Sequence, residues 1–177
     1  MNNEHGMSRV AVVGCPGSGK STFARALAAR TGLPLVHLDN IWWKPDRTHI
    51  TRDAFDAALA AELRKETWII DGYYSRTVEA RLAACDMVIF LDFDEQTCME
   101  GIAARVGQAR SDIPWTEQTI DPELVALVQD FQTEHRPKLL ALLDRYADRD
   151  IHIFRTRVEA DAWLQTIPTK EDKYHER

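Results

Sequence analysis

The sequence predicts an α/β fold in which a parallel sheet is covered by helices on both faces. Short, almost wholly apolar runs alternate along the chain with segments whose apolar residues recur every three or four positions. Runs of the first kind are typical of strands buried on both faces of a parallel sheet, and segments of the second kind are typical of amphipathic helices. Their succession indicates a doubly wound, three-layer arrangement.

Five short apolar runs are the predicted strands. Each run is apolar at nearly every position, whereas a strand that faced water on one side would alternate between apolar and polar residues. The five runs are Val10–Val13, Leu35–Leu38, Trp68–Ile70, Met87–Leu91 and Ile151–Phe154.

Helical segments are expected between the strands. From Lys20 to Arg30 the apolar residues fall on one stripe, and Gly32 marks the stop. Thr51 is expected to cap a second helix.

The C-terminal third of the chain also predicts helices. Asp121 followed by Pro122 is typical of a helix start, and Pro137 is expected to kink or split the helix that follows. A last helix, capped by Thr156, is expected from about Val158 to Ile167.

The composition is that of an ordinary globular protein. The chain has 177 residues, of which 45% are hydrophobic and 28% are charged, which is enough to bury a core without metal or disulfide. We expect one domain over residues 1–177, with its core at about 8–167.

Charge and cysteine usage exclude some classes of protein. The formal net charge is −6, which argues against nucleic acid as a partner. Cys15, Cys85 and Cys98 form no CxxC pair, so a reducing compartment is favoured. Because we find neither a signal peptide nor a membrane-spanning run, a cytoplasmic location is predicted.

The strongest motif is a glycine-rich loop between the first strand and the first helix. It reads GCPGSGKS and matches GxxxxGK[ST], a pattern whose backbone N–H groups and helix N-terminus hold a phosphate chain. Glycine is expected where a Cβ would hold the phosphates away from those amides. Lys20 should reach the β- and γ-phosphates of ATP, and Ser21 should offer its hydroxyl to Mg²⁺. The predicted ATP-binding residues here are Gly14, Pro16, Gly17, Ser18, Gly19, Lys20, Ser21 and Thr22.

Cys15 lies inside this loop. A helix N-terminus and a nearby lysine can lower the pKa of a thiol, which would suit a redox role. The alternative is a small side chain that fills space.

A phosphate loop by itself fits a switch GTPase, a motor ATPase or a small kinase. The [NT]KxD sequence with which GTPases recognise guanine is not found, and motor ATPases are generally larger. A kinase for a small molecule is therefore favoured, and three further segments support it.

The segment after the second strand supplies a candidate base. Asp39 lies at the predicted carboxyl edge of the sheet, where ligands of α/β folds bind. We expect it to orient an acceptor hydroxyl and to take its proton; the alternative is a capping or loop role. Trp42 and Trp43 are candidates to stack on an acceptor ring, or are simply buried. Lys44 is a candidate phosphate or acceptor contact, or a solvated lysine.

The third strand ends in an aspartate, as in a Walker B segment. Asp71 is expected to hold Mg²⁺ through a water, unless it only terminates the strand. Gly72 lets the chain turn beside the site. Arg76 is a candidate to bind an acceptor phosphate or carboxylate, and Tyr74 is assigned to the same acceptor side.

Arg105 and Arg110 form the third segment. Phosphoryl transfer needs cations that close over the spreading negative charge, often from a mobile lid. We therefore assign both arginines to catalysis, and Arg105 to ATP as well; the alternative is that they are surface residues.

Together the stretches GCPGSGKST, HLDNIWWKP, WIIDGYYSRT, VIFLDF and RPKLLALL resemble a bacterial adenylate-kinase-like group often labelled "DNA topology modulation protein". The resemblance covers roughly Val10 to Leu164. It implies a P-loop NTPase fold with a five-stranded parallel sheet of order 2-3-1-4-5, and ATP with Mg²⁺. It also places Arg105 at the adenine and, only loosely, Arg155 and Arg157 near the ATP base.

The chain departs from adenylate kinases in two respects. The stretch between Arg105 and Asp121 is too short for a full lid domain. Asp39 is similar in position to the aspartate of nucleoside and shikimate kinases, which phosphorylate hydroxyls.

The sequence therefore predicts an ATP- and Mg²⁺-dependent phosphotransferase. Its acceptor would be a nucleoside, a nucleotide or a similar small hydroxylated molecule. A short segment at about 40–66 is expected to bind the acceptor, and a short segment at about 105–120 is expected to form a lid. The alternative is a regulatory module that binds ATP and acts through a protein or gene partner. The sequence leaves the oligomeric state open.

Overall fold

The computed structural model describes residues 7–169. Within them the strands form one five-stranded sheet of order β2-β3-β1-β4-β5, and every pair of neighbours is parallel. This order is the one predicted. The strands are β1 (Arg9–Gly14), β2 (Leu35–His37), β3 (Trp68–Asp71), β4 (Met87–Leu91) and β5 (Asp150–Phe154).

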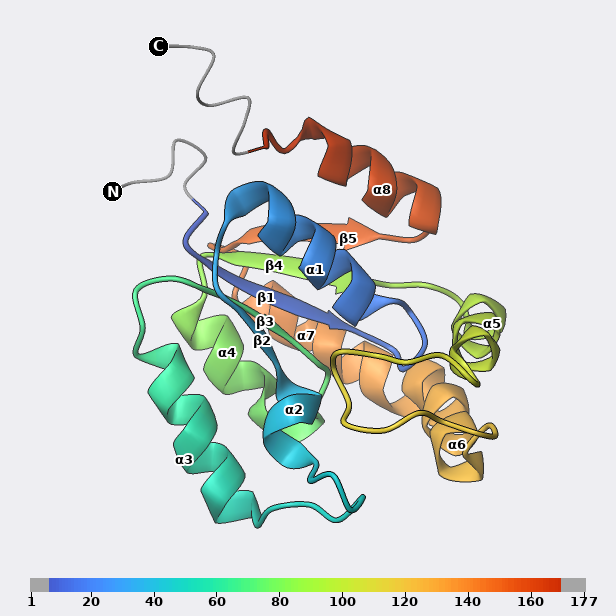
Figure 1. Cartoon of the computed structure of the whole chain (residues 1–177). Helices are drawn as coiled ribbons and strands as arrows, with labels where there is room; N and C mark the ends of the chain where they lie inside the picture. The colour runs from blue at the N-terminus through green and yellow to red at the C-terminus, as the bar shows by residue number, and fades with distance from the viewer. Residues whose placement is uncertain (1–6, 170–177) are drawn as a thin grey trace.

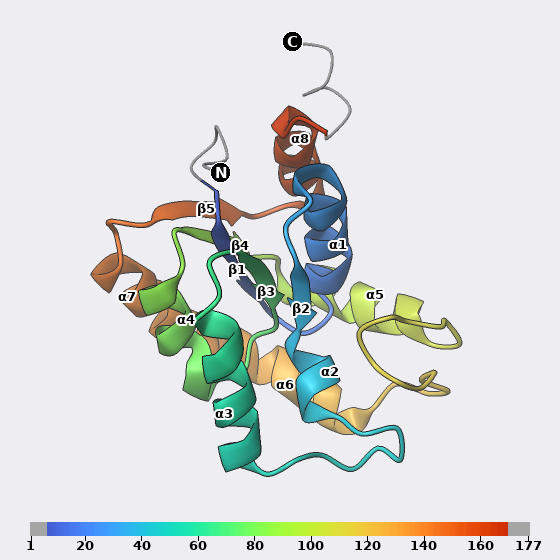
Figure 2. The same ribbon diagram turned by 60° about the vertical axis from the view of Figure 1, so that its left-hand side comes forward.

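Helices cover both faces of the sheet, so the three-layer prediction is confirmed (Figure 1). Helices α1 and α8 lie on one face, and α3, α4 and α7 lie on the other (Figures 1 and 2). The shorter α2 follows β2, and α5 and α6 lie beyond the ends of the central strands. The helices are α1 (Lys20–Thr31), α2 (Leu38–Trp42), α3 (Arg52–Leu63), α4 (Val78–Ala84), α5 (Glu95–Arg105), α6 (Pro122–Asp130), α7 (Arg136–Arg145) and α8 (Arg157–Thr166).

The predicted helix starts are correct where a capping side chain marks them. Thr51 accepts a hydrogen bond from the amide of Ala54, and Asp121 accepts one from Glu123. Thr156 and Glu159 form a complete capping box at the start of α8. These caps satisfy backbone N–H groups that the first helical turn leaves unpaired.

The helix that begins at Pro122 is interrupted, as Pro137 predicts. A π-helical turn, Phe131–His135, separates α6 from α7, and Pro137 lies in the first turn of α7. Proline removes one backbone donor and clashes with the preceding turn, so the regular hydrogen-bond ladder cannot run through it. Helices α2, α4 and α5 were not predicted, and Leu38, expected at the end of a strand, begins α2.

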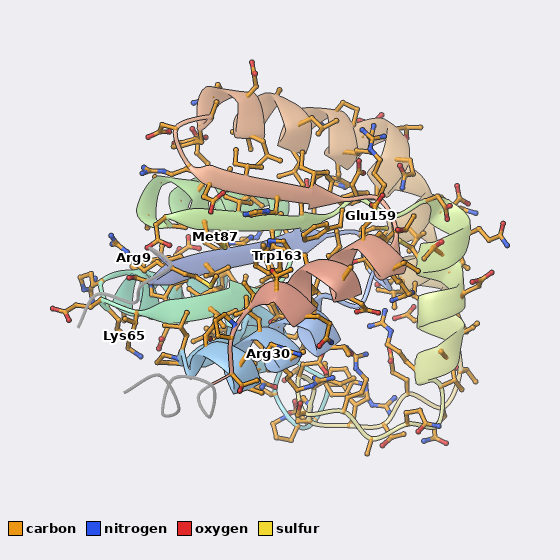
Figure 3. The ribbon with its side chains drawn as sticks, turned by 90° about the horizontal axis from the view of Figure 1, so that it is seen from above. Arg9, Arg30, Lys65, Met87, Glu159 and Trp163 are labelled. Carbon is orange, nitrogen blue, oxygen red and sulfur yellow. The ribbon has the colours of Figure 1, made fainter. Side chains whose placement is uncertain are left out.

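The core lies on both faces of the sheet. The residues of β3 and β4 are buried throughout, which explains their unbroken apolar character. On the α1 face, Trp163 of α8 lies over the sheet (Figure 3) and packs against Phe23, with their ring centroids 6.1 Å apart. No helix in the described part of the chain has the length and apolar character needed to cross a bilayer.

The strand register sets up the site. Val12 pairs with Asp71, which in turn pairs with His37, while Gly14 pairs with Leu91. The carboxyl ends of β1, β2 and β3 therefore lie side by side. The loops that leave these strands meet at one edge of the sheet, where parallel α/β folds bind ligands.

Candidate active site

A cavity of about 860 Å³ lies at this edge of the sheet. Its walls come from the phosphate loop, from α2 and the turn after β3, from α5, and from residues 106–121, which follow α5. Residues 106–121 overlap the stretch at about 105–120 for which a lid is predicted, and we use the name lid segment for them only as a label. Of the predicted site residues, those that line the cavity are Pro16, Gly17, Gly19, Lys20, Ser21, Thr22, Asp39, Trp42, Trp43, Asp71, Gly72, Tyr74, Arg105 and Arg110.

The phosphate loop is packed against α5. Gly17 has a φ of 81°, and a Cβ built there would lie 2.0 Å from the carbonyl oxygen of Cys98. In return, a Cβ on Gly101 would lie 1.9 Å from the carbonyl oxygen of Gly17. The sequence predicts that glycine makes room for phosphate; at Gly17 the structure adds a second reason, the close approach of a neighbouring helix.

We predict that Gly101→Ala weakens nucleotide binding about tenfold, or about 1.4 kcal/mol. The added methyl meets backbone rather than a side chain, so either α5 or the phosphate loop must move. Calorimetric titration with an ATP analogue checks this. Ala103→Gln, on an exposed position of the same helix, is the control, and equal affinities of both variants and the parent would contradict the prediction.

The side chain of Lys20 contacts the phosphate loop. Its Nζ donates a hydrogen bond of 2.8 Å to the carbonyl oxygen of Cys15. Burial lowers the pKa of Lys20. Anionic oxygens in the cavity would offset that penalty, because an opposite charge stabilises the ammonium form.

Cys15 is fully buried behind the loop. A hydrogen bond with Cys98 and burial together raise the pKa of the Cys15 thiol. A thiol that stays protonated is a poor nucleophile, so the structure favours the space-filling role for Cys15 over the redox role.

Asp39 faces the cavity from the first turn of α2. It is half-buried, and its Oδ1 accepts a hydrogen bond of 2.7 Å from the hydroxyl of Tyr74. Burial raises the pKa of Asp39, while the Tyr74 hydrogen bond and the charge of Lys20 oppose that rise. Such an environment suits a carboxylate that exchanges a proton.

Asp71 forms a buried pair with His37 at the ends of two neighbouring strands. The Nδ1 of His37 lies 2.7 Å from Oδ1 of Asp71. Burial alone would lower the pKa of His37, but the hydrogen bond and charge of Asp71 raise it overall. His37 therefore fixes the orientation of the carboxylate, a role that its sequence context did not reveal.

The turn after Asp71 is held in place by hydrogen bonds from a side chain of α4. Arg81 of α4 is fully buried and donates to the carbonyl oxygens of Gly72, at 2.6 Å, and Tyr73. Burial lowers the pKa of Arg81 to about 10. This support shapes the cavity wall, and sequence reasoning missed it because α4 itself was not predicted.

The lid segment brings an unpredicted carboxylate to the phosphate loop. Asp112 is 1% exposed, and its Oδ2 accepts a hydrogen bond of 2.9 Å from the hydroxyl of Ser21. Arg110 pairs with both oxygens of Asp112 and also donates to Glu117 at 2.9 Å. Arg110 thus lies at the predicted cavity, but its guanidinium is already matched by two carboxylates.

Arg105, by contrast, presents polar atoms without a protein partner. Its Nε and Nη2 are buried and make no hydrogen bond with any described residue. Burial and the neighbouring Arg110 lower its pKa. A buried guanidinium left in this state fits an anionic ligand that completes its hydrogen bonds.

The structure places the two arginines after β5 differently. Arg155 is exposed and does not line the cavity, whereas Arg157 does. Arg157 donates to the carbonyl oxygens of Ser18 and Gly17, at 3.2 and 3.3 Å. It is therefore Arg157 that touches the phosphate loop.

Two predicted acceptor contacts also lie outside the cavity lining. Arg76 is exposed and forms a two-pronged pair with Asp56, with N–O distances of 2.7 and 2.6 Å. Lys44 is exposed on the loop after α2.

Two predicted ATP-binding residues do not line the cavity either. Gly14 and Ser18 are buried behind the phosphate loop rather than on its open side.

Aromatic side chains form the wall opposite the phosphate loop. Trp43 meets Trp115 of the lid segment edge to face, with ring centroids 5.5 Å apart. Trp42 packs against Tyr74 at 6.2 Å. All four rings line the cavity, so the sequence identified Trp42, Trp43 and Tyr74, but it gave no signal for Trp115.

A family model described as an AAA domain matches residues 10–118, the part of the chain that holds most of this site. No match was found among curated proteins.

Two solved structures are similar in fold. A shikimate kinase from Bacteroides thetaiotaomicron has a TM-score of 0.56 and 16% identity, over 90% of this chain and 96% of that one. A shikimate kinase from Acinetobacter baumannii in complex with shikimate has a TM-score of 0.59 and 16% identity, over 91% and 93%. The chain has the fold of these proteins and, by the match over residues 10–118, belongs to the AAA domain family.

Proposed function

We propose that this chain is an ATP-dependent kinase that transfers the γ-phosphoryl group to a hydroxyl of a nucleoside, a nucleotide or a similar small acceptor. One observation carries the proposal. The phosphate loop with Lys20 and the carboxylate of Asp39 line the same cavity, and Asp39 is oriented by Tyr74. A phosphate grip and a candidate base that share one cavity are the parts that phosphoryl transfer needs.

ATP would be held by the phosphate loop and by arginines around it. The amides at the start of α1 and the ammonium of Lys20 would bind the phosphate chain. Arg105 has unpaired N–H groups to offer, and Arg157 lies against the loop carbonyls. Such cations would stabilise the charge that spreads over the transferred group.

The donor set also fits Mg²⁺, which prefers oxygen ligands and keeps part of its water shell. Ser21, Asp39 and Asp71 all line the cavity, and each has a side chain that carries oxygen. Ser21 and Asp71 would hold the ion, Asp71 through a water. When bound, Mg²⁺ would neutralise charge on the β- and γ-phosphates.

Asp39 would orient the acceptor hydroxyl and take its proton as the oxygen attacks the phosphorus. The hydrogen bond from Tyr74 keeps one carboxylate oxygen occupied, so the other oxygen is left for the acceptor. The fixed geometry lowers the entropic cost of bringing the two reactants together.

The acceptor side of the cavity supports a ring-bearing molecule. Trp42, Trp43, Tyr74 and Trp115 line it, and flat aromatic side chains stack well on planar rings. Because Arg76 is paired with Asp56 and lies outside the cavity lining, the cavity lacks this predicted site for an acceptor phosphate. This favours a hydroxyl as the attacking group.

A direct test is an acceptor screen with ATP and Mg²⁺, in which nucleosides, nucleotides and small alcohols are compared by ADP release and by isolation of the phosphorylated product. The proposal expects at least one acceptor to be phosphorylated faster than ATP is hydrolysed. ATP binding without transfer to any acceptor would contradict it and would favour the regulatory alternative.

The pH profile of kcat offers a further prediction. The base must be ionised, so kcat should rise with pH through the pKa of Asp39, and burial places that pKa above the usual carboxyl range. Because the Tyr74 hydrogen bond lowers this pKa, Tyr74→Phe should move the acid limb to still higher pH. A limb that stays in place or moves to lower pH in Tyr74→Phe would show that another group sets it.

A further inference from the structure

The lid segment makes a polar contact with Ser21, the residue of the phosphate loop that is proposed to bind the metal. The hydroxyl of Ser21 donates to Oδ2 of Asp112 at 2.9 Å. Asp112 comes from far along the chain and is 1% exposed, yet it lines the cavity. A carboxylate in such a place costs free energy unless its partners compensate.

The partners of Asp112 are hydrogen-bond donors. Arg110 donates to both carboxylate oxygens of Asp112, and the Ser21 hydroxyl donates to Oδ2. A carboxylate paired in this way with a guanidinium accepts hydrogen bonds, so the proton of the Ser21 hydroxyl points toward Asp112.

This proton position matters for metal binding. A hydroxyl has one proton and two lone pairs. When its proton is committed to Asp112, the lone pairs of Ser21 are directed elsewhere, and Ser21 lines the open cavity. Outer-shell partners of this kind orient a ligand atom and raise its basicity toward the metal.

We propose that Asp112 is a positioning residue for magnesium, acting through Ser21, so that the metal site is complete only when the lid segment is docked. The inference rests on the proposed function for the presence of Mg²⁺ with ATP. It adds that a residue of the lid segment controls how well the ion is held.

Other contacts support the docking of the lid segment at this place. The side chain of Asn40 donates to the carbonyl oxygen of Ser111 at 3.0 Å, and Arg25 donates to the Ser111 hydroxyl at 3.1 Å. The residue before Asp112 is thus tied both to α2, which carries Asp39, and to α1. The lid segment is therefore held by direct contacts to α1 and α2, the helices that carry Ser21 and Asp39.

The test measures binding rather than turnover. The affinity of a non-hydrolysable ATP analogue is measured by calorimetry with Mg²⁺ and with EDTA, and the ratio of the two affinities is the magnesium enhancement. We expect Asp112→Asn to lower this enhancement by about 10- to 100-fold, as loss of an outer-shell partner does, while affinity in EDTA falls little. Mn²⁺ binding followed by electron paramagnetic resonance should weaken in parallel.

Glu117→Gln is the matched control. Glu117 pairs with the same Arg110 but is not hydrogen-bonded to Ser21, so this variant should keep the full magnesium enhancement. An equal loss in Glu117→Gln would assign the effect to Arg110 and overturn the proposal. A second outcome would also overturn the proposal. If Asp112→Asn bound the analogue more tightly than the parent protein does, and by the same factor with and without Mg²⁺, Asp112 would only compete with the ligand.

A double-mutant cycle keeps the proposal falsifiable if Asp112→Asn is less stable. Asp112 acts through Ser21, so adding Asp112→Asn to Ser21→Ala should change the magnesium enhancement little, and fully additive losses would contradict this. The titrations contain no acceptor, so a failed acceptor screen leaves them unaffected. A parent protein that binds no analogue would instead overturn the proposed function, and this inference with it.

Discussion

Asp39→Asn is expected to lower kcat for phosphoryl transfer by about 10²- to 10⁴-fold, the range that general bases supply. The amide keeps the size of the side chain and can still accept the Tyr74 hydrogen bond, but it cannot take the acceptor proton. Affinity for an ATP analogue should stay within about threefold, because Asp39 is expected to touch the acceptor rather than the phosphate chain. Single-turnover kinetics with an acceptor from the screen measure the chemical step.

Asp46→Asn is the control for this experiment. Asp46 lies on the exposed loop after α2, and its carboxylate is bonded to Thr48 rather than to a cavity residue. Turnover should be unchanged in this variant. If Asp39→Asn retained the parental kcat, Asp39 would not be the base, and the proposed mechanism would be wrong.

Lys20→Ala is expected to weaken binding of the ATP analogue by about 10- to 100-fold, since charge-assisted hydrogen bonds contribute about 1.5–3 kcal/mol. Transfer should fall further, by about 10²- to 10³-fold in kcat, if the ammonium binds the transition state more strongly than ATP. Calorimetry and acceptor kinetics measure the two effects separately.

Thermal unfolding separates lost binding from lost structure. Burial lowers the pKa of Lys20, so an ionised Lys20 costs the folded protein free energy relative to the unfolded chain. Removing the ammonium relieves that cost, and Lys20→Ala should unfold at a temperature equal to or above that of the parent.

Lys44→Ala is the matched control for the binding experiment, because Lys44 lies outside the cavity lining, and it should leave binding unchanged. A Lys20→Ala variant with unaltered affinity and turnover would refute the assignment of the phosphate loop.

Features set by local sequence were predictable. Unbroken apolar runs such as Met87–Leu91 specify strands buried on both faces, and Thr156 specifies a helix start. The phosphate loop was equally clear, because its backbone geometry depends on glycines at fixed spacing. Asp39 and Asp71 could be placed at the edge of the sheet, since each follows a parallel strand at its carboxyl end.

The tertiary structure decided the contacts between residues that are far apart in the sequence. Gly101 must be glycine because Gly17, on another element, approaches it. Asp112 meets Ser21 only because the lid segment folds back over the phosphate loop. Neither contact leaves a periodic or spacing signal, so reading along the chain cannot find it.

The positions of several long basic side chains could not be predicted from the sequence either. Arg76 turns to Asp56 and away from the cavity, while Arg157, rather than Arg155, reaches the phosphate loop. A flexible guanidinium adopts the position in which a partner satisfies its donors, and that partner can come from any part of the fold. By itself the sequence determined the sheet, the phosphate loop and the two aspartates at its edge. The tertiary structure alone decided that Arg157 reaches the phosphate loop, that Arg76 lies outside the cavity lining and that Asp112 holds Ser21.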